Sequence, residues 1–230
     1  MNKEYTISYK TYFNERLKPV LFHGKEMHPL YIQVIFNRKP IYFKSYFFDL
    51  LAKETYGSNS VKPAAEDVIQ KEERLLEFLS RQQKDGFSLE QFKTDYQYYC
   101  RDLLDLMDVG FKDYMITFFF DDGKPELSRL VIGSKDLITS DGLMDALKDS
   151  LKPGLYNKLV EHTAYYAPPY LPLHEFAKKR IKEAFVTFSI YQWREPGLEN
   201  AFLDFLKTNY PGYTIGDVKR HINQTIDHLS

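Results

Sequence analysis

The sequence predicts an α+β protein: a small N-terminal three-stranded antiparallel sheet with a helix, a mixed middle region and an all-helical C-terminal part. Residues 30–48 are rich in β-branched and aromatic side chains, residues 4–14 alternate in polarity, and the chain beyond residue 172 has helical patterning throughout. We divide it into 1–62 (sheet domain), 63–110 (helical hairpin), 111–171 (mixed strand and helix) and 172–230 (helical domain).

The stretch 30–48, LYIQVIFNRKPIYFKSYFF, predicts two strands joined by a short basic turn. The turn is Asn37-Arg38-Lys39-Pro40, in which Asn tolerates a left-handed conformation and Pro fixes its own φ. Two cations, Arg38 and Lys39, are therefore expected at the tip of a hairpin.

A hairpin alone is only marginally stable, so a third strand and a helix must cover it. Residues 4–14 supply the strand, because Tyr5, Ile7 and Tyr9 alternate with Thr6, Ser8 and Lys10. Residues 15–29 between the strands are predicted to be a basic loop.

Residues 64–83 predict an amphipathic helix after Pro63, a residue favoured at a helix start. Ser88 and Gln91 form a capping-box pattern for a second helix. An apolar stripe runs along that helix, at positions 89, 92, 96, 99, 103 and 106, and predicts packing against the preceding helix.

In the middle region the run Tyr114–Phe120 (YMITFFF) predicts a buried strand, and residues 127–132 predict its partner after an Asp-Asp-Gly turn. Helices follow at 140–151 and 155–166. The segment APPYLP at 167–172 predicts a boundary. The remaining predicted helices are 173–193, 198–210 and 215–229, the last capped by Thr214 with Asp217 in its first turn.

The composition, with 43% hydrophobic and 27% charged residues, is that of an ordinary globular protein. The single cysteine, Cys100, excludes a disulfide framework and a cysteine-based zinc site, and it fits a reducing cytoplasm. No signal peptide or membrane-spanning stretch is apparent, so we expect a cytoplasmic protein with no membrane partner.

Charge is distributed unevenly along the chain. Residues 1–62 hold ten Lys and Arg against five acids, a net +5, whereas the rest holds 21 bases and 27 acids, a net −6. A basic module on an acidic body can still bind phosphate, because its field acts within about 8–10 Å. The alternative is a solvated sheet face with ordinary scatter of charge.

Catalytic signatures are absent from the sequence: there is no nucleophile elbow, Walker loop, dinucleotide fingerprint or His-Glu-x-x-His. His221 and His228 are seven residues apart without a third ligand nearby, and Asp121-Asp122 fits a turn better than a metal loop. We therefore expect no metal and no cofactor. Exposed tyrosines such as Tyr42 or Tyr46 could stack on bases, although aromatic-rich strands more often form core.

Two segments resemble the tyrosine recombinases, particularly the phage-integrase-like enzymes of Bacteroidetes. The hairpin LYIQVIFNRKPIYFKS, followed by EDVIQKEERLLEFL and FSLEQFKTD, is similar to their N-terminal arm-type DNA-binding region. The stretch FLDFLKTNYPGYTIGDVKRHINQTIDHL is similar to the last two helices of their core-binding (SAM-like) domain.

The resemblance implies binding of double-stranded DNA, with the sheet in the major groove. Arg38, Lys39 and Lys44 would then reach bases or phosphates, and Arg16 and Lys18 the flanking backbone. On the C-terminal helix the implied contacts are Thr214, through the backbone of its turn, together with Lys219, Arg220 and Gln224. Self-association on DNA is a further implied possibility.

The same resemblance implies that this chain is not an enzyme. Strand cleavage in the family needs an Arg, a Lys, a His-x-x-Arg pair and a nucleophilic Tyr from a further C-terminal domain, and the sequence contains no His-x-x-Arg. The chain is either an N-terminal portion of a recombinase or a non-catalytic relative. The competing hypothesis is a protein-interaction or structural module of the cytoplasm with no nucleic-acid role. A third alternative is an enzyme of unrecognised type, although the sequence indicates no nucleophile–base pair.

Overall fold

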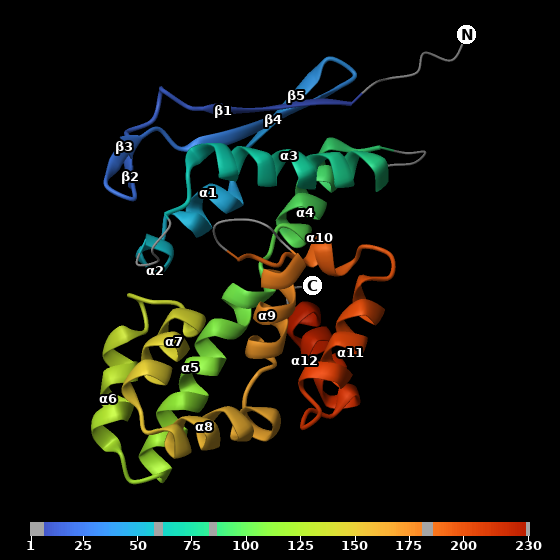
Figure 1. The fold of residues 1–230 in the computed structure, drawn as a ribbon. Coiled ribbons are helices and arrows are strands. Elements are labelled where there is room, and N and C mark those ends of the chain that lie inside the picture. Colours follow the sequence, from blue (N-terminus) through green and yellow to red (C-terminus); the bar gives the residue numbers. More distant parts are fainter. Residues whose placement is uncertain (1–6, 58–61, 83–86, 181–185, 229–230) are drawn as a thin grey trace. The chain divides into compact units, whose positions relative to one another are not determined.

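The three-stranded antiparallel sheet is present, in the order β1-β4-β5 (Figure 1). Its strands are β1 (Ser8–Phe13), β4 (Leu30–Phe36) and β5 (Lys39–Lys44), which confirms the α+β class. The computed structural model describes residues 7–57, 62–82, 87–180 and 186–228. The first residues of the predicted N-terminal strand, 4–6, lie outside this range.

The chain divides into two compact units. Unit 1 comprises 1–53 and 62–101, and unit 2 comprises 54–61 and 102–230. The sheet and the helix predicted for residues 64–83 therefore belong to one unit. Each unit has its own hydrophobic core.

Strand register divides the sheet of unit 1 into two different faces. Tyr9 pairs with Val34 and Val34 with Ile41, so these three side chains share one face. Leu30, Ile32 and Val34 on that face are fully buried, because the pleat turns alternate residues toward the helices. We call the opposite side the open face.

Three helices cover the buried face: α1 (Tyr46–Leu51), α3 (Ala65–Gln82) and α4 (Leu89–Tyr99). The ring of Phe43 lies 4.6 Å from that of Tyr96 in α4, and Phe13 contacts Phe48 in α1. In Figure 1, α3 runs across the sheet on this side. The strand predicted to continue to Phe48 ends at Lys44, because Ser45 caps α1 by accepting a hydrogen bond from the backbone N–H of Phe48.

The segment predicted to be a loop contains a small two-stranded ribbon. Strands β2 (Val20–Phe22) and β3 (Lys25–Met27) are antiparallel, joined by His23 and Gly24, which both have positive φ. Phe22 stacks on Phe48 at 5.1 Å and anchors the ribbon to α1. The sequence signal was weak because each strand has only three residues.

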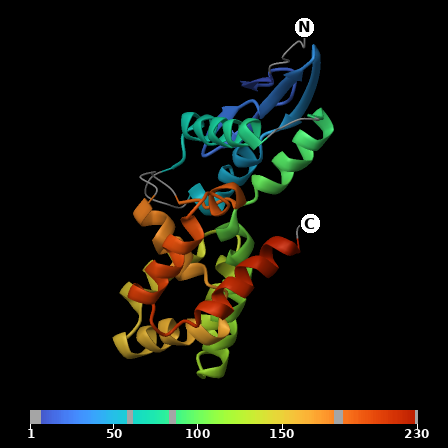
Figure 2. The same ribbon diagram turned by 90° about the vertical axis from the view of Figure 1, so that its right-hand side faces the viewer.

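Unit 2 is helical in its described residues. It begins with the short α2 (Glu54–Gly57). The other helices are α5 (Leu103–Asp121), α6 (Pro125–Ser134), α7 (Ser140–Ser150), α8 (Pro153–Tyr166), α9 (Tyr170–Arg180), α10 (Ile190–Trp193), α11 (Leu198–Asn209) and α12 (Ile215–Asp227). Helix α5 is central and contacts α6, α7, α8, α9 and α12. Figure 2 shows α12 alongside it.

The prediction of two strands in the middle region is wrong. Residues 114–120 lie within helix α5, and residues 127–132 lie within helix α6. Five helices pack against α5 and bury a broad face that includes Phe111 and Phe118, and its exposed side also carries apolar residues, Val109 and Phe120. A helix that is apolar on most sides loses its 3.6-residue pattern, and a short window of it resembles a buried strand.

The helix predicted to carry the stripe from residue 89 to 106 is broken after Tyr99. Asp102 caps α5 by accepting a hydrogen bond from the N–H of Asp105, and its other oxygen accepts one from Phe188. The helix predicted for 173–193 is likewise interrupted, because residues 186–188 are not helical between α9 (Tyr170–Arg180) and α10 (Ile190–Trp193). The predicted helices at 140–151, 155–166, 198–210 and 215–229 correspond to α7, α8, α11 and α12.

Candidate nucleic-acid interface

The open face of the sheet consists of nine residues in three cross-strand rows. The register gives the rows Ser8, Ile35 and Pro40; Lys10, Gln33 and Tyr42; and Tyr12, Tyr31 and Lys44. None of the nine is acidic. Ser8, Lys10, Pro40, Tyr42 and Lys44 are exposed, and the others are half-buried. No described helix of unit 1 covers this face (Figure 1).

Polar and aromatic groups on the open face contact one another across the strands. The Nε2 of Gln33 donates a hydrogen bond to the hydroxyl of Tyr42 at 3.0 Å. The rings of Tyr12 and Tyr31 are 6.4 Å apart, and the ammonium of Lys10 lies 5.6 Å from the centre of the Tyr12 ring. These contacts order the side chains before any ligand binds, which reduces the entropy that binding would cost.

The two lysines of the open face lie on its two outer strands. Lys10 is on β1, and Lys44 is on β5 in the next row. The ammonium of Lys44 forms an ion pair of 2.7 Å with Asp49 of α1, with both side chains about half exposed. Such exposed pairs contribute at most about 1 kcal/mol, so a phosphate can compete for Lys44.

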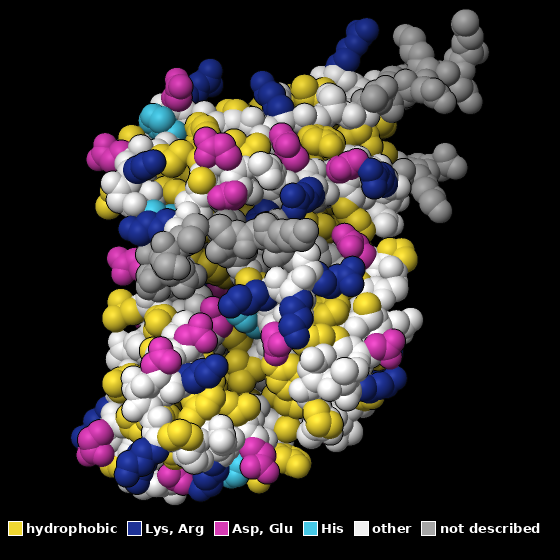
Figure 3. All heavy atoms as spheres, viewed as in Figure 1, with side chains coloured by type: hydrophobic (Ala, Val, Ile, Leu, Met, Phe, Trp, Pro, Cys, Tyr) yellow, Lys and Arg dark blue, Asp and Glu magenta, His cyan; other side chains and the backbone are white. Residues whose placement is uncertain are grey.

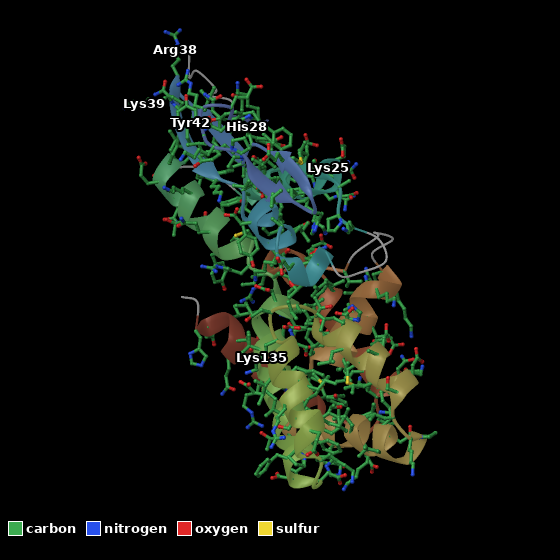
Figure 4. The ribbon with its side chains drawn as sticks, turned by 90° about the vertical axis from the view of Figure 1, so that its left-hand side faces the viewer. Lys25, His28, Arg38, Lys39, Tyr42 and Lys135 are labelled. Atoms are coloured by element: carbon green, nitrogen blue, oxygen red, sulfur yellow. The ribbon has the colours of Figure 1, made fainter. Side chains whose placement is uncertain are left out.

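The hairpin tip has an unusual backbone at Arg38. The connection is two residues long, Asn37 with φ 49° and Arg38 with φ 62°, because Lys39 and Pro40 already belong to β5. Positive φ at both positions is typical of a type I′ turn, where Gly is favoured at the second position. The β2–β3 ribbon follows that preference with Gly24. Figure 4 shows Arg38 projecting from the end of the sheet.

Lys39 lies on the helix side of the sheet, because it pairs with Phe36 and shares its face with Ile41 and Phe43. The pKa of Glu90 in α4 is lowered, chiefly by hydrogen bonds from its own backbone N–H and from Ser88, and additionally by the charge of Lys39. Of the two tip cations, only Arg38 is turned away from the acidic helices.

The predicted cations Arg16 and Lys18 are exposed in the loop after β1. Because Phe13 pairs with Leu30 and Ser8 with Ile35, this loop follows the end of the sheet opposite the Arg38 tip. In Figure 4, Arg38 and Lys39 lie at one end and Lys25 of the β2–β3 ribbon toward the other. The structure therefore separates the predicted N-terminal cations into two groups.

The predicted contacts in unit 2 lie at or on α12. Thr214 caps α12, although its side chain makes no capping hydrogen bond. Lys219 forms a 2.6 Å ion pair with Glu199 of α11, and Arg220 pairs with Asp217 in the first turn. Gln224 is exposed. Asp217 places negative charge at the helix N-terminus, where it competes with a phosphate.

Unit 2 also contains a groove of about 640 Å³ between α5 and α8. Aromatic side chains line it, including Tyr114, Phe118 and Tyr166, with the carboxylates of Asp121 and Asp122 at one end. Asp122 pairs with Lys158. Negative charge in this groove disfavours phosphate, and acidic and basic side chains are interspersed over the face of unit 2 seen in Figure 3.

The set of contacts predicted from the sequence did not include the centre of the open face. It included the cations of the turn, Lys44 and the cations of the loop after β1, and it omitted Lys10, Tyr12, Tyr31 and Gln33 as contacts. The sequence did contain the information, since the alternation of residues 4–14 already places Lys10 and Tyr9 on different faces of the strand. Extending that alternation to the partner strand would have identified Gln33.

No family model, curated protein or solved structure matches this chain. Within the described residues, no group of three or more His, Cys, Asp or Glu side chains could hold a metal ion. Every described helix is too short or too polar to cross a lipid bilayer.

Proposed function

We propose that unit 1 binds double-stranded DNA by laying the open face of its sheet in the major groove. The observation that carries this proposal is the composition of that face: nine residues without an acid, with a lysine on each outer strand and a polar row at the centre. In DNA, phosphates flank the major groove and base edges on its floor present hydrogen-bonding groups. The outer lysines therefore complement the phosphates, and the central polar row complements the base edges.

The dimensions of the sheet support this geometry. Three strands spaced by about 4.8 Å have an axis-to-axis width of about 10 Å, and the major groove is about 12 Å wide. With β4 centred over the bases, β1 and β5 lie toward the two phosphate backbones. Lys10 and Lys44 then reach opposite backbones, and Gln33 and Tyr42 face base edges.

Arg38 supports the proposal independently. A non-glycine residue in the left-handed region costs about 1 kcal/mol, and such strain concentrates at functional sites. In this proposal Arg38 extends along the groove and binds a phosphate. The free energy of this contact compensates for the unfavourable backbone conformation of Arg38.

We further propose that this chain is the DNA-binding portion of a site-specific recombinase or integrase-like protein and that it is itself non-catalytic. The support is the resemblance of the hairpin and C-terminal segments, together with a sheet that has a helix-covered face and an open face. Because Asp217 places a carboxylate in the first turn of α12, where a phosphate would otherwise bind, we confine the proposed interface to unit 1.

The test measures binding of the full chain to random-sequence duplex DNA between about 50 and 200 mM salt. We expect affinity to fall steeply with salt, and Lys10→Ala to weaken binding and flatten the logarithmic salt slope by about 0.9. The matched control is Lys148→Ala, which removes an equal charge from an exposed position in α7.

Three outcomes contradict the proposal. Absence of duplex binding at the lowest salt rejects a DNA function and favours the alternative of a protein-interaction module. Unchanged binding by Lys10→Ala rejects the open face as the interface. An equal effect of Lys10→Ala and Lys148→Ala indicates attraction by overall charge instead of a defined surface.

A further inference from the structure

Gln33 occupies the centre of the open face. It lies in the middle of the central strand β4, between Lys10 on β1 and Tyr42 on β5. The other eight side chains of this face are cationic, aromatic, aliphatic or small, and only Gln33 carries a carboxamide. A residue at this position faces the floor of the groove if the sheet binds as proposed.

The hydrogen bond to Tyr42 orients the amide of Gln33. Nε2 uses one of its two hydrogens for the Tyr42 hydroxyl, at 3.0 Å. The second hydrogen and the carbonyl Oε1 have no hydrogen-bond partner among the described residues. One donor hydrogen on Nε2 and the acceptor Oε1 of the same amide are therefore left for a ligand.

We infer that Gln33 reads an adenine in the major groove; this rests on the proposed function and specifies its sequence preference. Adenine presents the acceptor N7 beside the donor N6 amine, which matches the remaining N–H and Oε1 of Gln33. Guanine presents two acceptors there, N7 and O6, so Oε1 would face an oxygen. Neither pyrimidine offers such a pair.

Tyr42 assists as a positioning residue. Its hydroxyl accepts the hydrogen bond from Gln33, so its own proton remains available to an acceptor on the DNA. Replacing Tyr42 by Phe removes the group that orients the amide. We expect Tyr42→Phe to reduce the preference for adenine without abolishing duplex binding.

The experiment starts with selection of tight-binding duplexes from a random pool by the full chain. We expect the selected site to contain an adenine whose replacement by 7-deazaadenine weakens wild-type binding on the order of tenfold to a hundredfold. The Gln33→Ala variant should bind the adenine duplex and the 7-deazaadenine duplex with equal affinity. Gln33→Glu should prefer cytosine at that position, because a carboxylate accepts a hydrogen bond from the cytosine amine.

The control is Gln97→Ala, the same chemical change at an exposed position of α4 outside the open face, and it should retain the adenine preference. If the chain binds duplexes but Gln33→Ala still distinguishes adenine from 7-deazaadenine, this inference is overturned and DNA binding stands. Selection of guanine at the position that Gln33 controls also overturns it. If no duplex is bound, the proposed function fails together with it.

Discussion

The hydroxyl of Tyr96 lies 2.9 Å from each carboxylate oxygen of Glu72, and both side chains are buried in unit 1. The same carboxylate accepts hydrogen bonds from Ser45 Oγ and from the backbone N–H of Phe47. This cluster joins α3 and α4 to α1 beneath the sheet. Ser45 also donates its backbone N–H to the carbonyl of Leu30, which links the cluster to β4.

The buried carboxyl predicts a specific pH dependence of stability. Burial raises the pKa of Glu72 from 4.5 to about 7, against the opposing effect of the hydrogen bonds from Ser45, Tyr96 and Phe47. The folded state then holds a proton that the unfolded state releases, so the free energy of unfolding falls as pH rises from about 4.5 through 7. The shift in the pKa of Glu72 corresponds to a total decrease of about 3 kcal/mol in the free energy of unfolding across this pH range.

Glu72→Gln keeps the shape and removes the titration. We expect the difference in unfolding free energy between variant and wild type to change with pH between about 5 and 8, in favour of the variant at higher pH. Amide hydrogen exchange of β4 measures this locally in unit 1. Parallel pH profiles of the two proteins would contradict a titrating Glu72.

Arg38→Gly should separate stability from binding. Glycine relieves the strain at φ 62°, and after allowance for the greater freedom of the unfolded chain we expect a gain of about 0.5–1 kcal/mol. Loss of the guanidinium should weaken duplex binding and reduce its salt slope by about 1. Arg38→Ala is the matched variant, because it loses the same charge and keeps the strained backbone. Equal stability changes in the two variants would argue against backbone strain.

Sequence patterning predicted elements well wherever each element has one buried face. The alternation in β1 and the stripe of α3 both follow from that condition. It fails for α5, which packs against five helices and also carries apolar residues, Val109 and Phe120, on its exposed side. It also cannot detect the helix break before Asp102, because Asp102 accepts a hydrogen bond from the backbone N–H of Phe188, 86 residues away. Such contacts are set by tertiary structure and leave no local pattern.

The candidate site was predicted in part. The turn and its cations are local features, so Arg38 was identified from the sequence. The face that a strand residue occupies depends on the register of the strands. The register places Lys39 on the buried face and pairs Lys10 with Gln33 on the open face. Ion pairs such as Lys44 with Asp49 and Lys219 with Glu199 also require the folded structure.

Lys112 in unit 2 is a buried charge whose removal should be costly. Its ammonium is 2.7 Å from Asp108 and donates to the backbone carbonyl of Lys135, with 1% of the side chain exposed. Lys112→Met leaves the largely buried carboxylate of Asp108 without its cation, so we expect a loss of about 3–5 kcal/mol in the free energy of unfolding, measured by chemical denaturation. Lys135→Met removes the partner of Asp113 from a more exposed pair nearby and should cost less than about 1 kcal/mol. Similar losses in both variants would contradict the role of burial.

Asp49 holds the second lysine of the open face, so its removal should strengthen DNA binding. In Asp49→Asn the ammonium of Lys44 loses its 2.7 Å partner and becomes available to a phosphate. We expect duplex affinity to rise by up to about fivefold and the salt dependence to steepen, since one more counterion is displaced from the DNA.

Asp49 also lies in the first turn of α1, where a carboxylate is favourable, so thermal denaturation should accompany the binding series. The matched control is Asp204→Asn, which frees Lys207 from an exposed ion pair in unit 2. Both substitutions change the net charge by the same amount. An equal rise in affinity for the two would therefore assign the effect to overall charge, whereas a rise confined to Asp49→Asn places Lys44 against the phosphate backbone.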